Sequence, residues 1–333
     1  MDQFSAHLDR GWDLVQRGDT RGAEASAKRA LEIDPQSPEA YNLLGYVAAL
    51  EGEASEAIEN YRQAIALDET YLEAMLNAAE VYIHPIGEFD EAIDMCDQAL
   101  DLAETDEEII DALLLKFDAL LGKGDAKGAA AVIGRVPDGP YKNANHAFLI
   151  GRAYYEIGEV DRAAGLIEEA ATREPGHAEA HYYLGLVRDE RGDAKGATIA
   201  FLRCRQLDLD TAPPSWSLPR ELFAKLTEKA LLSLDAVLRR YVRDATVHVS
   251  DVPGIELVAD GVDPRALVLL DGLGVPESPP QNATRIFVYQ RNIERLAGAS
   301  ERLEQEITSA FEREITATFL ETDSAHKDKR ELN

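Results

Sequence analysis

Small residues recur about every 34 residues along the first two thirds of the chain, and this period constrains the fold more than any other feature. In residues 41–68, Gly45 and Ala57 stand where two helices would touch, and Gly52 stands where the chain would turn between them. The same frame gives further turn glycines, contact glycines and helix-starting alanines: Gly18, Gly158 and Gly192; Gly11, Gly151 and Gly185; Ala23, Ala163 and Ala197, with two weaker copies framed on Ala92 and Ala129. Because helix backbones approach closely only at small residues, the sequence predicts six helix–turn–helix units over residues 5–209.

This pattern resembles the tetratricopeptide repeat family. Pro35 and Pro175 end second helices in the way that is typical of the family, whereas Glu69 and Leu209 stand where other repeats have proline, and Val136 replaces the late alanine of the fourth unit. The resemblance implies an all-α superhelix with a concave face, usually a surface that holds other proteins or peptides.

The first helix of each unit lines the concave face in this family. Mapping that frame onto the sequence places seven residues on or near the face: Trp12, Asn42, Tyr46, Phe148, Arg152, Tyr155 and Tyr182. Exposed aromatic side chains and arginine are the groups that most often anchor a protein partner. The alternative is that Trp12 and Tyr155 only pack between neighbouring repeats.

The formal net charge is −28, and it is concentrated in the repeats. Residues 1–210 hold 19 basic and 42 acidic residues, a net charge of −23. Such a surface repels nucleic acid and anionic lipid, and it favours a basic segment on a protein partner. The alternative is that the acidity only maintains solubility.

Several features predict a cytoplasmic protein without a cofactor. The first residues, MDQFSAHLDRGW, lack the apolar core of a secretory signal, and no run reaches the 18 or so apolar residues of a membrane span. The two cysteines, Cys96 and Cys204, fall at small-residue positions inside predicted helices, which favours buried thiols in a reducing compartment. Gly272 and Gly274 lack the lysine of a phosphate-binding loop, so we interpret them as a turn.

Three prolines within residues 211–219 interrupt the helical pattern, and the period is lost beyond them. We therefore expect a repeat domain at residues 1–210, a linker at 211–219, a second domain at 220–323 and a polar tail at 324–333. The elements expected in the second domain are a helix at 220–241, strands at 246–249, 256–258, 266–270 and 285–291, and a helix at 300–320. This order predicts a small α+β domain.

The segments LVLLDGLGVPES and RIFVYQRNIERLA resemble the minimal zincin-type bacterial metallopeptidases, over roughly residues 221–323. The last helix of that family carries His-Glu-x-x-His, whose two histidines bind one zinc while the glutamate acts on the metal-bound water. Here the aligned residues keep Glu314 but replace both histidines, with Arg313 and Ala317, and Asp323 stands near the position of the third ligand. Because arginine and alanine cannot bind zinc, the resemblance implies a zincin-like shape without a metal.

Two functions of different classes remain. The first is a protein-interaction scaffold, in which the repeats bind a partner and the inactive zincin-like domain is a second binding surface. The second is a hydrolase, either zinc-dependent with unusual ligands or metal-free with Glu314 as general base. Glu314 falls within the apolar arc of its helix, where a cleft base or a remnant held by Arg313, Arg291 or a backbone donor would each explain it. The missing histidines favour the scaffold.

Overall fold

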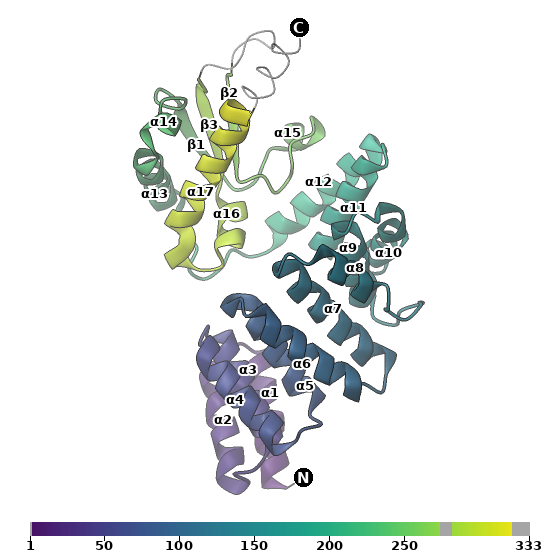
Figure 1. The fold of residues 1–333 in the computed structure, drawn as a ribbon. Coiled ribbons are helices and arrows are strands. Elements are labelled where there is room, and N and C mark those ends of the chain that lie inside the picture. The colour runs from purple at the N-terminus through teal and green to yellow at the C-terminus, as the bar shows by residue number, and fades with distance from the viewer. Residues whose placement is uncertain (1, 274–281, 322–333) are drawn as a thin grey trace. The chain divides into compact units, whose positions relative to one another are not determined.

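The computed structural model describes residues 2–273 and 282–321, which form two compact units that divide between Arg173 and Glu174. The first unit contains five helix pairs, and the second contains a sixth pair followed by a small α+β domain. The two helices of each pair lie side by side (Figure 1). In the fully described residues 2–210 the pairs are α1 (Gln3–Gln16) with α2 (Thr20–Ile33), α3 (Pro38–Leu50) with α4 (Ala54–Leu67), α5 (Leu72–Val81) and its short extension η1 (Tyr82–Ile86) with α6 (Phe89–Leu102), α7 (Asp106–Gly122) with α8 (Ala126–Ile133), α9 (Ala144–Glu156) with α10 (Val160–Arg173), and α11 (Ala178–Glu190) with α12 (Ala194–Asp210). The six predicted helix–turn–helix units are confirmed.

The turn inside each pair is built by a glycine and, in three pairs, by the aspartate that follows it. The turn glycines have φ between 74° and 83°, a left-handed conformation that residues with a Cβ rarely adopt: Gly18, Gly52, Gly87, Gly124, Gly158 and Gly192. Asp19, Asp125 and Asp193 then cap the next helix, each accepting a hydrogen bond of 2.9 Å from the backbone N–H three residues on. The recurring Gly-Asp dipeptides therefore end one helix and start the next.

Gly45 shows why the period demands small residues. A Cβ at this position would lie 2.6 Å from the ring of Tyr61, which is itself 1% exposed between α3 and α4. The two helices therefore touch through the glycine backbone and a buried aromatic ring, as the sequence pattern predicts.

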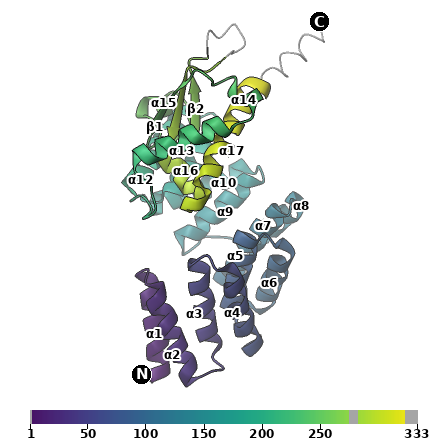
Figure 2. The same ribbon diagram turned by 90° about the vertical axis from the view of Figure 1, so that its left-hand side faces the viewer.

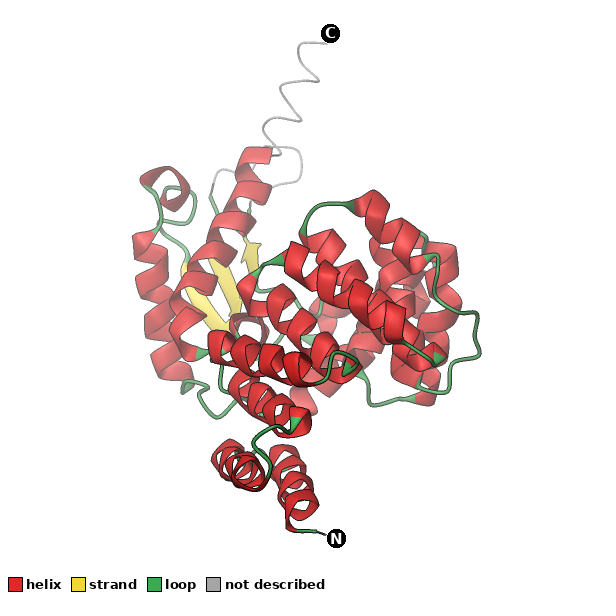
Figure 3. Ribbon diagram, turned by 60° about the horizontal axis from the view of Figure 1, so that its bottom comes forward, coloured by secondary structure: helices red, strands yellow, loops and turns green. Residues whose placement is uncertain are grey.

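The α+β domain is a three-stranded sheet covered on one face by helices (Figure 3, strands in yellow). Its described elements are α13 (Arg220–Ser233), α14 (Ala236–Arg239), β1 (Thr246–Ser250), α15 (Ile255–Ala259), β2 (Val268–Asp271), β3 (Arg285–Tyr289), α16 (Gln290–Ala297), η2 (Ser300–Arg302), α17 (Leu303–Ile315) and η3 (Thr316–Glu321). The strand order is β1-β3-β2, with β1 parallel and β2 antiparallel to β3.

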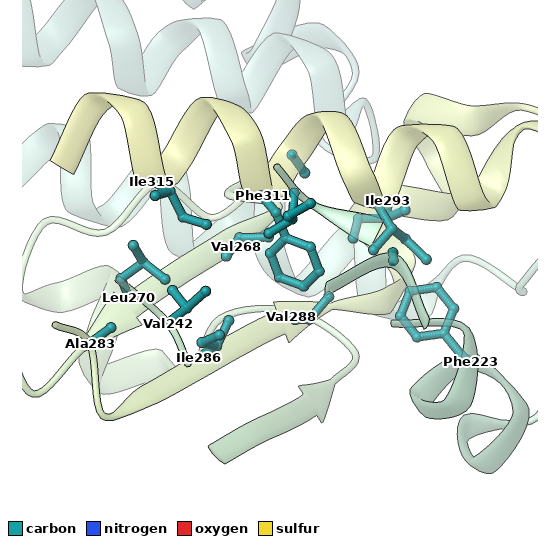
Figure 4. Packing of buried hydrophobic residues seen from close by; sticks show 14 of the residues in the cluster. Phe223, Val242, Val268, Leu270, Ala283, Ile286, Val288, Ile293, Phe311 and Ile315 are labelled. Carbon is teal, nitrogen blue, oxygen red and sulfur yellow. The ribbon is translucent and has the colours of Figure 1, made fainter. Parts of the chain in front are cut away.

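The core of this domain lies between the sheet, α13 and α17. Phe311 and Ile315 of α17 point toward Val268 and Val288 of the strands, and Phe223 of α13 closes one end of the cluster (Figure 4). The expected packing of the last helix on the strands is therefore confirmed.

Several element boundaries differ from the sequence prediction. The expected strand at 256–258 is wrong, because these residues lie in the short helix α15. Only Val258 of this helix is buried, so the buried side chain lies on one helix face and side chains do not alternate between buried and exposed as in a strand. The expected helix at 220–241 ends at Ser233, because Asp235 accepts the Val237 N–H at 2.7 Å and starts the separate helix α14. Strand β3 gives way to α16 at Gln290, within the strand expected at 285–291.

The proline-containing segment at 211–219 lies inside the second unit and is held by side chains of α16. Arg291 donates a hydrogen bond to the Thr211 carbonyl at 2.5 Å, and the Ser217 hydroxyl donates to both carboxylate oxygens of Glu294. Arg291 also donates to the carbonyls of Asp208 and Leu209 at the end of α12, at 3.3 and 3.2 Å. Trp216 packs against the domain core. The domain ranges taken from the sequence stay a prediction.

Candidate functional site

The first helices of the five pairs in the first unit pack against one another in chain order, and we call the surface formed by α1, α3, α5, α7 and α9 the first-helix face. Figure 2 shows α1, α3, α5 and α7 following one another along this unit. Each helix occupies the same place in its repeat, so side chains about 34 residues apart in sequence become neighbours across two helices.

An aromatic pair occupies one end of this face. The rings of Trp12 on α1 and Tyr46 on α3 meet edge-on, with centroids 5.3 Å apart and planes at 63°. Both side chains are half-buried. The two rings therefore pack against each other between neighbouring repeats, and each keeps part of its surface exposed.

Polar side chains join the first helices further along the face. Asn77 donates to the Asn42 carbonyl oxygen at 3.0 Å, His146 lies 2.9 Å from Asp111, and Arg152 donates to both oxygens of Asp118 at 2.9 Å. We call these three contacts the inter-repeat polar pairs. The partners in each pair are 34 or 35 residues apart, so each pair links equivalent positions of consecutive repeats.

The structure separates the seven candidate partner-binding residues by exposure. Asn42 and Phe148 are 0% and 4% exposed, so their side chains position the face rather than contact solvent. Four of the others are half-buried in the first unit, namely Trp12, Tyr46, Arg152 and Tyr155. The seventh, Tyr182, belongs to the second unit.

Tyr182 is engaged by the chain's own α+β domain. Its hydroxyl donates to Asp263 at 2.9 Å, and the guanidinium of Arg265 lies 4.6 Å from the centre of its ring. Burial, followed by the nearby Asp263 carboxylate, raises the pKa of the Tyr182 phenol. The segment that follows α15 therefore covers the aromatic group of the last repeat.

Arg265 is the centre of this contact. It donates to Glu179 on α11 at 2.6 Å and to Asp208 on α12 at 3.1 Å, and Asp208 also accepts from Arg295 at 2.7 Å. The side chains of Arg265 and Asp208 are only 10% and 12% exposed. Sequence reasoning missed this cluster, because a single arginine in the loop DGVDPRALV carries no periodic signal. The inter-repeat polar pairs, in contrast, could have been found by aligning the repeats.

Glu314 lies half-buried on α17, between exposed Arg313 and the buried core. Burial raises the pKa of its carboxyl group, and Arg313 partly opposes this shift. Arg291 does not hold it, since that guanidinium is bonded to backbone carbonyls near Asp208. Ala317 is exposed, and Asp323 lies outside the described residues. Within residues 2–273 and 282–321, no group of three or more His, Cys, Asp or Glu side chains is placed to hold a metal ion.

Two of the cavities in the described residues lie near the contacts given above. The first unit has one of about 250 Å³ at the start of α7 and α9, whose lining includes the carboxylates of Asp106, Glu107 and Asp138 and the ring of Tyr141. The second unit has one of about 350 Å³ between residues 211–216 and α16. None of the described helices is long and apolar enough to cross a membrane.

Comparison with known proteins agrees with this architecture. Two family profiles described as tetratricopeptide repeat match the chain, one over residues 8–71 and 148–208 and the other over residues 48–109. The type IV pilus assembly protein PilF of Pseudomonas aeruginosa is 41% identical over 63 residues, which are 19% of this chain and 25% of that protein. The chain therefore matches a quarter of the length of this curated relative.

Solved structures show the same fold. PilF of Pseudomonas aeruginosa superimposes with a TM-score of 0.53 at 21% identity, covering 62% of this chain and 91% of that one. PilW, described as a widely conserved type IV pilus biogenesis factor, gives 0.53 at 17% identity, covering 67% and 98% of the two chains. Together with the repeat geometry above, these matches show that the N-terminal two thirds of the chain consists of tetratricopeptide repeats.

Proposed function

We propose that this protein is a protein-interaction scaffold that holds a peptide or protein partner on the first-helix face of repeats one to five. The observation that carries the proposal is the set of half-buried aromatic residues Trp12, Tyr46 and Tyr155 on first helices, two of which, α3 and α9, also hold inter-repeat polar pairs. Aromatic groups that keep part of their surface open on a rigid helical layer are suited to anchor a partner. The match to PilF supports a binding scaffold and carries no role in pilus assembly to this chain, since it covers only repeat residues.

The partner segment is basic in this proposal. Residues 1–210 carry a net charge of −23, and the lining of the cavity at the start of α7 and α9 includes three carboxylates, the ring of Tyr141 and one lysine, Lys142. A lysine or arginine side chain of the partner would gain from the carboxylates and from the aromatic face. The proposed surface does not include Tyr182 of the last repeat, because Asp263 and Arg265 already engage that side chain.

A peptide array probed with the full chain tests this proposal. We expect bound peptides to be enriched in lysine and arginine, and the double change Tyr46→Ala with Tyr155→Ala to weaken their binding by about 1–3 kcal/mol. The control is Ile33→Ala, which truncates a 47% exposed apolar side chain on the second helix α2 and should leave binding unchanged. Unchanged binding by the double variant would show that the first-helix face is not the site.

The α+β domain is, in this proposal, a zincin-like domain that binds no zinc and serves as a second binding surface. The residues at the aligned ligand positions do not fit zinc, because Arg313 is cationic and Ala317 has no donor atom. A hydrolase that uses Glu314 is the second candidate, favoured by the raised pKa of this half-buried carboxyl group. Stoichiometric zinc in the purified protein would favour the hydrolase, and zinc bound only after Arg313→His with Ala317→His would favour the scaffold.

A cytoplasmic location is also part of the proposal. Cys96 and Cys204 are both free and fully buried, and burial raises the pKa of each thiol to about 12. Thiols of this kind behave as small apolar side chains and suit a reducing compartment. Fractionation of cells that express the protein, followed by immunodetection, tests this location.

A further inference from the structure

A group of exposed apolar and cationic side chains surrounds α14 in the α+β domain. Leu232 and Val237 are 69% and 51% exposed, and Arg239, Arg240 and Arg243 are exposed beside them. We call these five residues the basic–apolar patch. Four of the five line an open hollow of about 470 Å³, and Val237 is the exception. The full lining is Leu231, Leu232, Ala236, Arg239, Arg240, Val242 and Arg243.

The three arginines of the patch form no ion pair with any described carboxylate. Arg239 donates to the Leu232 carbonyl at 2.9 Å, and Arg240 donates to the Tyr241 hydroxyl at 2.6 Å. Two acidic residues are near in sequence: Asp235 accepts the backbone N–H of Val237 at the start of α14, and exposed Asp244 directly follows Arg243 in the chain. Elsewhere in the same unit, buried Arg265 and half-exposed Arg295 are both paired with carboxylates. In a chain of net charge −28, residues 235–244 hold three arginines and two aspartates, so this segment is locally positive.

Packing holds part of the patch in place before any partner arrives. The guanidinium of Arg240 lies 4.6 Å from the centre of the Tyr241 ring, and that ring stacks on Phe319 with centroids 4.6 Å apart and planes at 10°. An arginine held by an aromatic ring loses less side-chain entropy when it binds a carboxylate.

We propose that the basic–apolar patch docks an acidic, amphipathic segment of a partner protein. Glutamates or aspartates of that segment pair with the three guanidinium groups, which suit bidentate contact with carboxylates, while its apolar side chains cover Leu232 and Val237. A membrane of anionic lipid fits less well, because a flat bilayer surface would leave the hollow of about 470 Å³ unfilled. A second copy of this chain fits less well, because two chains of net charge −28 repel each other at long range. This inference deepens the proposal that the α+β domain is a second binding surface, and it does not depend on the first-helix face.

The test uses the full chain and a synthetic helical peptide of about 16 residues, with glutamates on one face and leucines on the other. Fluorescence anisotropy should show binding that weakens as salt is raised. The triple change Arg239→Glu, Arg240→Glu and Arg243→Glu should weaken binding about tenfold or more, and Leu232→Ser should weaken it by a smaller factor. Circular dichroism of each variant confirms that it is folded.

Matched controls separate the patch from general charge and from the repeats. Lys195→Glu with Lys225→Glu changes two exposed cations outside the patch and should leave peptide binding unchanged. Tyr46→Ala with Tyr155→Ala should also leave it unchanged, so that failure of the first-helix face and failure of the patch can be told apart. Equal binding of a peptide with lysines in place of glutamates would overturn the inference, as would equal binding by the triple variant.

Three further outcomes would assign the patch to another occupant and so overturn the proposal. They are stronger binding to phosphatidylserine vesicles than to the peptide, salt-sensitive dimers of the wild type that the triple change abolishes, and a gain in peptide affinity when residues 322–333 are deleted.

Discussion

Polar side chains link residues over different sequence distances in the two units. In the first unit, the inter-repeat polar pairs join residues 34 or 35 positions apart, so each one links only adjacent repeats. In the second unit, Arg265 reaches Asp208 and Glu179, which are 57 and 86 positions away, and Ser217 reaches Glu294 over 77 positions. The first arrangement confines a disturbance to neighbouring repeats, whereas the second makes distant segments depend on one another.

Of the substitutions that follow, Arg265→Ala should destabilise the protein most. Arg265→Ala removes the arginine paired with Glu179 and one of the two arginines paired with the mostly buried Asp208, and it uncovers the Tyr182 ring. Breaking a buried ion pair in this way lowers the free energy of unfolding by about 3–5 kcal/mol. The loss is smaller here to the extent that Arg295 still pairs with Asp208. Hydrogen exchange should therefore rise across α11, α12 and α15 while α1–α10 keep their protection.

The control for this change is Arg203→Ala, which removes an exposed arginine of α12 that contacts only the Pro175 carbonyl. It should leave hydrogen exchange in the second unit close to that of the wild type. Equal effects of the two changes would mean that Arg265 does not couple the last repeat to the α+β domain.

Gly45→Ala should have a smaller and more local effect. The added Cβ would lie 2.6 Å from the ring of Tyr61, so the helix pair must separate or the ring must move, at a cost of about 1–3 kcal/mol. Hydrogen exchange should increase in α3, α4 and their immediate neighbours only. Gly165→Ala is the matched control, because a Cβ there meets no atom within 4 Å and alanine favours the helix. Increased exchange throughout the first unit after Gly45→Ala would contradict the picture of repeats that affect only their neighbours.

Glu314→Gln should have the smallest effect, and its sign depends on pH. Burial raises the folded-state pKa of Glu314 above its ordinary value of 4.5, so the folded state binds this proton more tightly than the unfolded state does. The wild type therefore loses stability as pH rises through the folded-state pKa, whereas glutamine does not titrate. At pH 7 the variant should be more stable by less than about 1 kcal/mol, since the carboxylate is partly hydrated. Urea unfolding at pH 7 and at about pH 4 measures the difference in free energy of unfolding between the variant and the wild type. This difference should be smaller at the lower pH. A larger stability difference at about pH 4 than at pH 7 would contradict a raised pKa of Glu314.

The sequence predicts most of the repeats because their information is local and periodic. Gly45 against Tyr61, and the turn glycines with their capping aspartates, each specify structure within one repeat. The strand around Val288 is also predicted, since a short run of β-branched and aromatic residues after a turn is distinctive. The strand around Val268 is predicted from a leucine-rich run that ends at a glycine-containing loop. The segment at 256–258 was predicted wrongly, because a run of three apolar or acidic residues does not distinguish a strand from one helical turn.

The candidate site could be predicted only in part. Repeat register places Trp12, Tyr46 and Tyr155 on first helices, yet it cannot show that Asn42 is buried against Asn77 or that Phe148 is 4% exposed. For Tyr182 the register predicts an open face, and the structure instead provides Asp263 and Arg265 as its partners. Those contacts span about 80 positions and depend on how the α+β domain folds, so no local pattern encodes them.

The contact between Arg265 and the last helix pair also bears on how the protein can be shortened. A repeat array that stops without a cap presents a helix face made for a following repeat, and such a face promotes aggregation. Here the loop after α15, together with Arg291 and the Pro253 carbonyl that accepts from Arg205, covers α11 and α12 in place of a seventh repeat. Truncation after residue 210 would therefore yield a repeat fragment prone to precipitation, whereas truncation after Arg173 removes the sixth pair and its cover together and gives the better starting point for studying the first unit alone.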